Sequence, residues 1–413
     1  MKKIAGFLDK HLGYVLVIPA IIFILTFSIL PIAQSMRYAF FDFQLNDQQK
    51  SGLYFSERYN KSLMEETHEY IGYFLESEME IVEKPETKKA IEAGMASINE
   101  HFSAIGALVD QPEDIQEISG QQRQEIEQHS TAVVAELDKI YANNDTFALK
   151  EDMYAVASEL DGSIIEPNFI GLQNFQKILT DERVHSSIYV TLFFTVFSVL
   201  LELCLGLALA MIMNKAMKGQ GIIRTMSLIP WAIPTSVAAL IWAYMYNGDN
   251  GIVATLLAQA GIIGGTADLL LSSTGALWSV IFADVWKTTP YMALLLLAGL
   301  QTIPTSLYEA ASIDGANKWK QFIHVTLPLL KPSIMVALLF RTLDAFRVFD
   351  LIWVLTGGGP GGSTESISIY AYKTMFAQTR FGYGSAVIIL MALVVGIISY
   401  AYIKLLDVKL TNN

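Results

Sequence analysis

The sequence has few charged residues and almost no cysteine. Only 16% of its 413 residues are charged, whereas soluble domains usually contain about 25%. Hydrophobic residues make up 53% of the chain, and the mean hydropathy is +0.40. The single cysteine, Cys204, excludes an internal disulfide. Low charge combined with high hydropathy predicts a membrane protein with several spans.

Motifs for catalysis and nucleotide binding are also missing from the sequence. In the stretch LTGGGPGGSTES, Gly357 and Gly362 have the spacing of a phosphate loop, but Ser363 stands where that loop needs lysine. The sequence contains no zinc-type cluster of His and Cys and no G-x-S-x-G. We therefore expect no catalytic residues, no metal site and no cofactor bound by this chain, and no nucleic-acid partner.

The negative charge is confined to one part of the chain. Residues 42–166 contain 27 acidic and 9 basic residues, a net charge of −18, although the whole chain carries only −12. The remainder is therefore mildly basic. This asymmetry predicts an acidic insert within a basic membrane protein.

Six segments are long and apolar enough to cross a bilayer, which requires about 20 mainly apolar residues. We place them at 13–36, 187–213, 222–246, 274–300, 333–355 and 384–406. The apolar run of the first segment is longer than that of a signal peptide, and no small-residue cleavage pattern follows it. The sequence thus predicts an all-α integral membrane protein with six transmembrane helices.

The basic residues predict that both termini are cytoplasmic, because cytoplasmic loops are enriched in Lys and Arg. The loop 247–273, which would be external, has none. The acidic insert is then external as well. The basic residues at the cytoplasmic ends are Lys2, Lys3, Lys10, Lys215, Lys218, Arg224, Lys318, Lys320, Lys331, Lys404 and Lys409.

The acidic insert has helical periodicity, which predicts three or four helices packed as a bundle. Its role is either that of a solvated extension or that of a docking or sensing surface. One apolar seam has spacings of four and three and consists of Ile91, Met95, Ile98, Phe102, Ile105 and Val109. Similar stripes are Leu63, Thr67, Tyr70 and Phe74, and Val133, Leu137, Ile140 and Tyr141.

Two of the expected spans contain residues that are unusual inside a membrane. Pro230 and Pro234 interrupt segment 222–246, and interrupted helices either line transport routes or only aid packing. Ionisable residues in spans usually face a bundle interior or a wet cavity. The candidates for a translocation path are Arg341, Asp344, Arg347, Asp350, Trp353, Glu202 and Asp284, together with the two prolines, and Lys287 adds a further charge. Structural pairing is the alternative.

A polar stretch, residues 306–332, separates two of the apolar segments on the expected cytoplasmic side. Ser306 and Glu309 have the spacing of a capping box, which predicts a helix starting at Leu307. Gly315 is placed to end that helix. A second helix is expected next, and Pro328 and Pro332 are expected to form the turn into the next span.

This stretch, EAASIDGANKWKQFIHVTLPLLKP, resembles the EAA loop of membrane subunits of binding-protein-dependent ATP-driven importers. Its pattern is E-A-A-x-x-D-G-A, then an aromatic residue, then L-P-L-x-x-P. The flanks WKTTPYMALLLLAGLQTIP and FRVFDLIWVLTGGGPGGSTES, with PIAQSMRYAFFDF and FIGLQNFQKIL, resemble the carbohydrate branch, that is, maltose-type and glycerol-phosphate-type permeases. The resemblance covers roughly residues 1–43 and 168–413.

The resemblance implies a permease subunit that translocates a sugar or oligosaccharide in a bacterial inner membrane. Its partners would be a second permease subunit, two cytoplasmic ATPase subunits that bind ATP and Mg²⁺, and an external solute-binding protein. The residues that match the ATPase-docking motif are Glu309, Ala310, Ala311, Asp314 and Gly315. We therefore expect an N-terminal span within 1–43, an external helical insert at 44–167 and a five-helix permease core at 168–413.

Two other functions are compatible with parts of the sequence. A membrane sensor could use the external bundle to bind a signal, but it would usually need a cytoplasmic output domain. An ion-coupled secondary transporter could use the intramembrane carboxylates to carry a cation. The secondary transporter leaves the EAA-like loop without a role.

Overall fold

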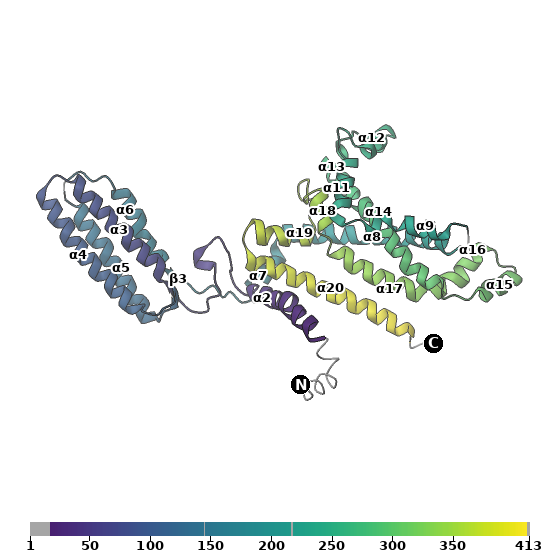
Figure 1. Ribbon diagram of the computed structural model, residues 1–413, viewed down its shortest axis with the longest axis horizontal. Helices are drawn as coiled ribbons and strands as arrows, with labels where there is room; N and C mark the ends of the chain where they lie inside the picture. The colour runs from purple at the N-terminus through teal and green to yellow at the C-terminus, as the bar shows by residue number, and fades with distance from the viewer. Residues whose placement is uncertain (1–16, 144, 216–217, 411–413) are drawn as a thin grey trace, which may run out of the picture. The chain divides into compact units, whose positions relative to one another are not determined.

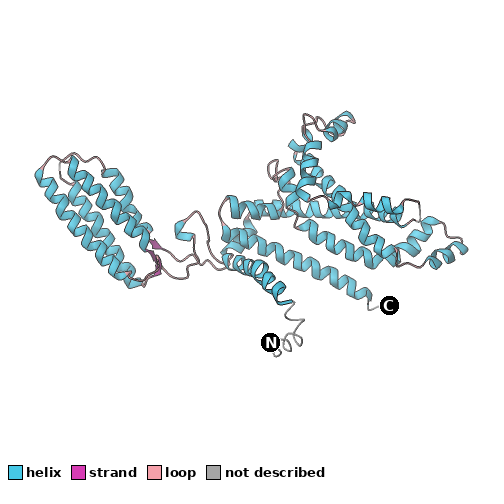
Figure 2. Ribbon diagram, viewed as in Figure 1, coloured by secondary structure: helices cyan, strands magenta, loops and turns pink. Residues whose placement is uncertain are grey.

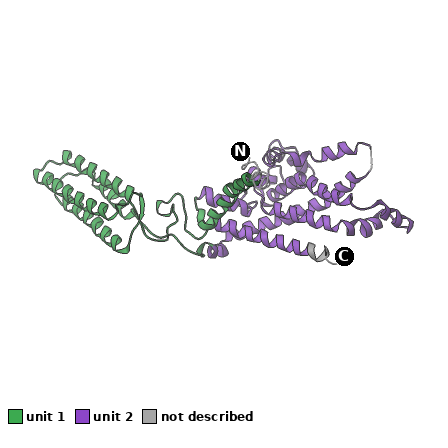
Figure 3. Ribbon diagram, turned by 60° about the horizontal axis from the view of Figure 1, so that its bottom comes forward, with its two compact units in different colours: residues 1–174, 379–383 green, residues 175–378, 384–413 purple. Residues whose placement is uncertain are grey.

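The computed structural model describes residues 17–143, 145–215 and 218–410. Helices make up most of it (Figure 2), which confirms the predicted all-α class. The chain divides into two compact units, residues 1–174 with 379–383 and residues 175–378 with 384–413 (Figure 3).

The first unit contains the N-terminal span and a four-helix bundle. The span, Val17–Tyr38, includes a π-helical turn, η1 (Leu25–Ile29), and α2 (Leu30–Tyr38). The bundle consists of α3 (Lys61–Ile81), α4 (Pro85–Leu108), α5 (Gly120–Tyr141) and α6 (Lys150–Gly162) (Figure 1). The remaining elements are η2 (Gln48–Lys50) and strands β1 (Arg58–Asn60), β2 (Ile115–Glu117) and β3 (Ile164–Ile165).

The bundle core forms where the periodicity predicts it. In α4, Ile91, Ile98 and Ile105 are fully buried, and Gly94 lets Ile140 of α5 approach, since a Cβ on Gly94 would lie 2.5 Å from Ile140. In α3 the predicted stripe is wrong by one residue at several positions. The aliphatic side chains of Met64, Ile71 and Leu75 face the core, whereas Tyr70 is exposed.

A small antiparallel sheet, in the order β2-β1-β3, joins the chain segments at one end of the bundle. The sequence patterns do not predict it, because each strand has only two or three residues. Arg123 of α5 reinforces this end by binding three carboxylates, those of Glu57, Glu127 and Glu166. These hydrogen bonds raise the pKa of the Arg123 guanidinium above its ordinary value.

Five helices of the described residues are long and apolar enough to cross a membrane, and a bent pair makes a sixth. They are Val17–Tyr38, Glu182–Asn214, Ser273–Leu300, Lys318–Phe346 and Phe381–Leu405. The bent pair joins Gln220–Ala232 to Thr235–Met245 at 88°. The predicted number of spans is therefore reached if the bent pair counts as one; residues 13–16 of the first predicted span lie outside the described residues.

The second unit is built around α8 (Glu182–Asn214), α14 (Ser273–Leu300) and α17 (Leu327–Phe346), which lie side by side (Figure 1). The bent pair comprises α9 (Gln220–Ser227), α10 (Ile229–Ala232) and α11 (Thr235–Met245). The other helices are α7 (Gln173–Thr180), α12 (Ile252–Gln259), α13 (Asp268–Leu271), α15 (Thr305–Ile313), α16 (Lys318–Gln321), η3 (Phe322–Thr326), α18 (Asp350–Leu355), α19 (Ile367–Tyr372), η4 (Lys373–Ala377) and α20 (Phe381–Leu410).

The prediction of one continuous helix at 333–355 is wrong. The helix ends at Phe346, and a new short helix, α18, begins at Asp350. The backbone of Arg347 and Phe349 leaves the helical conformation, and the Ser366 hydroxyl donates a 3.0 Å hydrogen bond to the Val348 carbonyl. A partner 18 residues away thus satisfies a carbonyl that the break leaves without a helical bond.

Candidate functional site

The three central helices bring three carboxylates together around Arg341. From α17, Arg341 donates to Glu202 of α8, with 2.9 Å between Nη2 and Oε1, and it also contacts Asp284 of α14. Its Nη1 lies 3.1 Å from Oδ2 of Asp344, one helical turn further along α17. The Thr288 hydroxyl donates to Glu202 across 2.6 Å. The cluster therefore ties α8, α14 and α17 into one unit.

Burial makes this pairing obligatory. Arg341 is 1% exposed and Glu202 is 0% exposed, and a charge removed from water is tolerated only when partners and hydrogen bonds compensate it. Arg341 has three carboxylate partners. Glu202 therefore belongs to the scaffold behind the pocket described next, and it does not line that pocket.

A polar pocket of about 350 Å³ opens beside this cluster, between α11, α14 and α17–α18. Acidic and basic side chains line it in equal numbers: Asp284, Asp344, Asp350, Lys287, Arg341 and Arg347. Trp231, Thr235, Thr288, Val348, Phe349 and Leu351 complete the lining. The pocket thus offers both donors and acceptors, with its charges balanced.

The break at Pro234 helps to form this pocket. Pro230 lies in the first turn of α10, where its missing N–H costs no helical hydrogen bond. Pro234 caps α11, and the helix axis bends by 88° there. Because the helix is interrupted, the Trp231 carbonyl is free to accept a hydrogen bond from Lys287 Nζ, at 3.3 Å. The bend therefore supplies a wall of the pocket.

Aromatic rings lie beside the charged groups. Trp231 stacks on Tyr291, with 5.6 Å between ring centroids and 13° between planes. Phe349 stacks on Trp353, with 5.6 Å between centroids. Of this second pair only Phe349 lines the pocket, so Trp353 supports it from behind.

The structure places the candidate path residues in three groups. Five line the pocket, namely Arg341, Asp344, Arg347, Asp350 and Asp284. Glu202 and Trp353 contact the pocket residues from behind, and Pro230 and Pro234 shape the bent pair. The sequence interpretation omitted Thr235, Thr288 and Phe349. Thr288 lies one turn after Asp284, so its position on the same helix face was a usable signal.

The EAA-like loop forms a turn that Gly315 makes possible. Helix α15 ends at Ile313, and Gly315 adopts φ +78°, which is costly for residues with a Cβ. The Ala316 N–H bonds the Ala311 carbonyl at 2.8 Å, and the Gly315 N–H bonds the Ser312 carbonyl at 3.1 Å. These two bonds define a Schellman motif, as the sequence predicts for a glycine that ends the helix.

The predicted capping box is wrong. Helix α15 begins at Thr305, directly after Pro304, and its N-cap makes no side-chain hydrogen bond. Because Ser306 already lies inside the first turn, its side chain does not act as the cap, and Glu309 stays exposed. Glu309 is therefore available to a partner.

The prediction that Pro328 and Pro332 form a turn into the next span is also wrong. A single helix runs from Lys318 to Phe346, with Pro328 in the first turn of α17 and Pro332 inside it. A π-helical turn, η3, comes directly before α17, of which Pro328 is the second residue. This wider turn accommodates a residue without an N–H where a regular α-helical ladder would lose a bond.

The glycine-rich loop after α18 is held by a buried carboxylate. Glu365 accepts two hydrogen bonds from Arg183, at 2.7 and 2.9 Å, and one from Lys373, at 3.0 Å. Lys373 also donates to the Gly357 carbonyl at 2.8 Å. Burial alone would raise the pKa of Glu365, but the hydrogen bonds from Arg183 and Lys373 lower it overall. These contacts fix the loop next to α8 and η4.

Residues 202–412 match the family described as "Binding-protein-dependent transport system inner membrane component". This region begins after the four-helix bundle and contains the polar pocket and the EAA-like loop.

Curated relatives agree with this match. The chain is 47% identical over 241 residues to the trehalose/maltose transport system permease MalF of Thermococcus litoralis, covering 58% of this chain and 81% of the relative. It is 45% identical to the trehalose permease SugA of Mycobacterium tuberculosis, over 57% and 75% of the two chains. It is 35% identical to the sn-glycerol-3-phosphate permease UgpA of Agrobacterium fabrum, over 62% and 83%.

Solved structures share the fold. A chain of a bacterial ABC transporter for the acidic polysaccharide alginate matches with a TM-score of 0.53 and 22% identity, over 70% of this chain and 99% of that chain. These similarities favour an importer subunit over a sensor or a secondary transporter. The central helices, the EAA-like loop and the matches over them show that the chain belongs to the family of binding-protein-dependent transport system inner membrane components.

Proposed function

We propose that the chain is a permease subunit of an ATP-driven importer and that its polar pocket contacts an uncharged sugar or oligosaccharide during transport. The observation that carries this proposal is the balanced set of three acidic and three basic side chains lining a pocket among the central helices. Such a wall can donate and accept hydrogen bonds to hydroxyl groups without requiring a charge on the ligand.

An aromatic ring in the pocket lining and the names of similar permeases support a sugar as the transported substrate. Trp231 offers a flat ring at the pocket wall, where an amphipathic sugar face can pack while its hydroxyls reach the charged groups. The similar permeases from Thermococcus litoralis and Mycobacterium tuberculosis carry trehalose or maltose in their names. We therefore expect a neutral glucose-containing disaccharide to be the first substrate to test.

The α15–α16 segment would be the site of coupling to ATP hydrolysis. Its motif residues Glu309, Ala310, Asp314 and Gly315 are exposed, and Ala311 is half-buried. Ile313, on the same helix, is 86% exposed. Trp319 of α16 is 67% exposed as well, and large apolar side chains that are exposed together on neighbouring helices are typical of a docking surface. A cytoplasmic ATPase subunit that binds ATP and Mg²⁺ would pack against it.

The subunit composition of the importer and the domain organisation of this chain complete the proposal. Two permease subunits, two ATPase subunits and an external solute-binding protein would form the complete importer, with both termini of this chain cytoplasmic. A solved alginate transporter with the same fold is in complex with a sugar-bound periplasmic protein. The chain would comprise an N-terminal span at 1–43, an external accessory bundle at 44–167 and a permease core at 168–413.

Transport assays on pocket variants test the proposal. The complete importer, with the wild-type chain or a variant, is reconstituted in proteoliposomes and uptake of trehalose and maltose is measured. Asp350→Asn should lower uptake at limiting sugar about 10–100-fold, because a hydrogen bond to a charged group typically contributes about 1.5–3 kcal/mol. Asp350 makes no ion pair among the described residues, so its replacement leaves the Arg341 cluster intact.

Asp249→Asn is the matched control, since Asp249 is exposed and lies outside the pocket. Its uptake should equal that of the wild type. The ATPase rate without sugar should be unchanged in both variants. If Asp350→Asn transports both sugars as well as the control does, the pocket is not the sugar path.

A further inference from the structure

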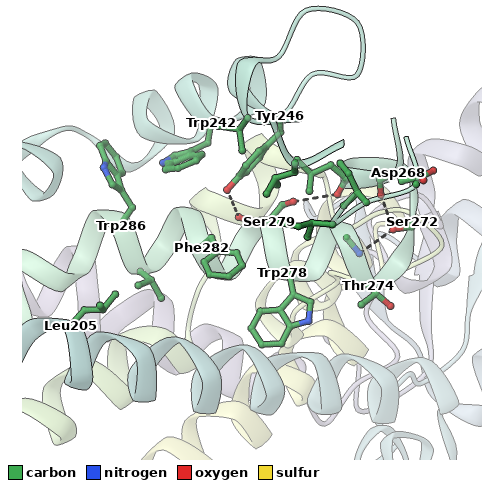
Figure 4. Close-up of a pocket in the computed structure, with 18 residues that line it drawn as sticks. Leu205, Trp242, Tyr246, Asp268, Ser272, Thr274, Trp278, Ser279, Phe282 and Trp286 are labelled. Atoms are coloured by element: carbon green, nitrogen blue, oxygen red, sulfur yellow. Dashed lines mark hydrogen bonds between the residues drawn. The ribbon is translucent and has the colours of Figure 1, made fainter. Parts of the chain in front are cut away.

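A second, larger pocket lies between α8, α11, α12, α13 and one face of α14, and it has a different character. Its volume is about 1080 Å³, and it is lined mainly by aromatic and aliphatic side chains (Figure 4). Trp242, Trp278, Phe282 and Trp286 are among them. None of its lining residues belongs to the polar pocket described above.

The pocket is amphipathic along its length. Asp268, Ser272 and Thr274 gather at one end, whereas Leu205 and Trp286 lie at the other (Figure 4). Ser272, the N-cap of α14, and Trp286 within α14 mark these ends and are fourteen residues apart. At a rise of 1.5 Å per residue they are separated by about 21 Å. This equals half of a bilayer about 40–45 Å thick with its headgroup regions.

That length and gradient fit one leaflet of a membrane. Helix α14 is one of the apolar spans, so its N-terminal end lies near a membrane surface and Trp286 lies near the middle of the bilayer. A transmembrane helix of a partner protein would cross both leaflets and would be apolar throughout its core. An amphiphile that occupies a single leaflet matches the polar and apolar ends better.

Two groups in the pocket lack an internal partner. The buried Trp242 indole Nε1 has no hydrogen-bond acceptor among the described residues, although the ring packs against Trp286 and Tyr246. Asp268 makes no ion pair among the described residues, and the lining includes no Lys, Arg or His. Among the described residues, the pocket thus has an exposed carboxylate without an ionic partner at its polar end, whereas the indole N–H is enclosed between aromatic rings.

We propose that this pocket binds one phospholipid of the surrounding bilayer, and that its headgroup carries a primary ammonium. The ammonium would pair with the Asp268 carboxylate, and an acyl chain would run along Trp278 and Phe282. An anionic headgroup is disfavoured because it would face Asp268 with no cation nearby. A choline headgroup has no N–H to donate to the carboxylate.

Native mass spectrometry of the full chain tests this proposal. The chain is released from nanodiscs that contain equal amounts of phosphatidylethanolamine, phosphatidylcholine and phosphatidylglycerol, and the retained lipids are identified. The wild type should retain one phosphatidylethanolamine, enriched about tenfold over each of the other two lipids, as expected for one charge-assisted hydrogen bond.

Two variants separate the headgroup from the acyl chain, and each has a matched control. Asp268→Asn should abolish the headgroup preference, whereas Asp249→Asn, outside the pocket in the same connecting segment, should keep it. Leu257→Trp should fill the pocket and reduce retention of all three lipids. Leu256→Trp, on the exposed face of the same helix, should not. Circular dichroism verifies that each variant is folded.

Several results would overturn the proposal. Equal retention of the three lipids by the wild type would refute the ammonium–Asp268 pairing. Equal retention by Leu257→Trp and Leu256→Trp would show that the lipid lies elsewhere. If the retained lipid is lost when a second permease subunit assembles with the chain, protein covers this pocket in the transporter and the assignment is wrong.

Discussion

Replacing Arg341 by methionine should destabilise the second unit more than any other single change in the polar pocket. The substitution keeps most of the side-chain volume but removes the partner of Glu202 and Asp284, which are 0% and 6% exposed. Removing one member of a buried ion pair typically costs about 3–5 kcal/mol, because the remaining charge is buried without compensation. Both carboxylates lose contacts here.

Thermal unfolding of the purified chain, followed by circular dichroism, measures this effect. For a unit of roughly 150–250 residues, 1 kcal/mol corresponds to about 2–4 °C in Tm, so Arg341→Met should lower the Tm of this unit by roughly 6–20 °C. Arg347→Met is the matched control. Its side chain is 69% exposed and lies 3.7 Å from Asp344, so the expected cost is only about 0–1 kcal/mol.

Neutralising the carboxylates isolates the electrostatic cause. Adding Glu202→Gln and Asp284→Asn to Arg341→Met should recover a large part of the lost stability, since no uncompensated charge then remains buried. If Arg341→Met unfolds at the same temperature as Arg347→Met, the cluster does not stabilise the helices. If the triple variant is no more stable than the single variant, lost packing and not charge is the cause.

Three other predictions concern separate parts of the chain. Gly315→Asp should leave membrane insertion intact but weaken ATPase co-purification and sugar uptake, because a side chain at φ +78° costs about 1–2 kcal/mol and disturbs the exposed turn. Replacing residues 45–165 by a short linker should leave insertion and assembly intact, because the matched family region starts at residue 202. Lowering the pH should loosen the glycine-rich loop, because the pKa of Glu365 is below its ordinary value of 4.5. The ion pairs of the Glu365 carboxylate therefore stabilise the protein fully above pH 4.5. This stabilisation is lost as the pH falls through the lowered pKa. Thermal unfolding of Glu365→Gln at pH 7 and below pH 4.5 should therefore show a smaller pH dependence than the wild type.

Each of these predictions has its own contrary outcome. Gly261 also has positive φ, +70°, and lies outside the EAA-like loop, so Gly261→Asp should retain ATPase co-purification; an equal loss in both variants would point to general misfolding. Failure of the shortened chain to reach the membrane would show that the bundle is needed for folding. An unchanged pH dependence in Glu365→Gln would mean that other groups govern the acid sensitivity.

Sequence patterns predicted most helices and turns, because contacts between residues close in the chain determine these elements. The seam from Ile91 to Ile105 is buried in the bundle as its periodicity predicts, and Gly315 ends α15 in a Schellman motif. In both cases the decisive neighbours lie within a few residues along the chain. Hydropathy likewise located the spans, because a helix in a bilayer must present about 20 apolar residues.

Three predictions about helix ends were wrong, two because of adjacent residues and one because of a contact 18 residues away. The capping box failed because Pro304 starts α15 before Ser306 can act as its cap. The continuous helix at 333–355 failed because Ser366 stabilises a break at Val348. The π-helical turn before Pro328 kept a helix continuous where proline alone predicts a turn.

The sequence by itself determined the class of this protein, its spans, its acidic insert and its EAA-like loop, since composition, periodicity and motif spacing are properties of neighbouring residues. Only the tertiary structure decided which intramembrane charges pair and which line a pocket. Glu202 and Arg341 are 139 positions apart in the chain, and they meet because α8 packs against α17. A buried charge depends on the partners that folding brings to it, and hydropathy contains no information about those partners.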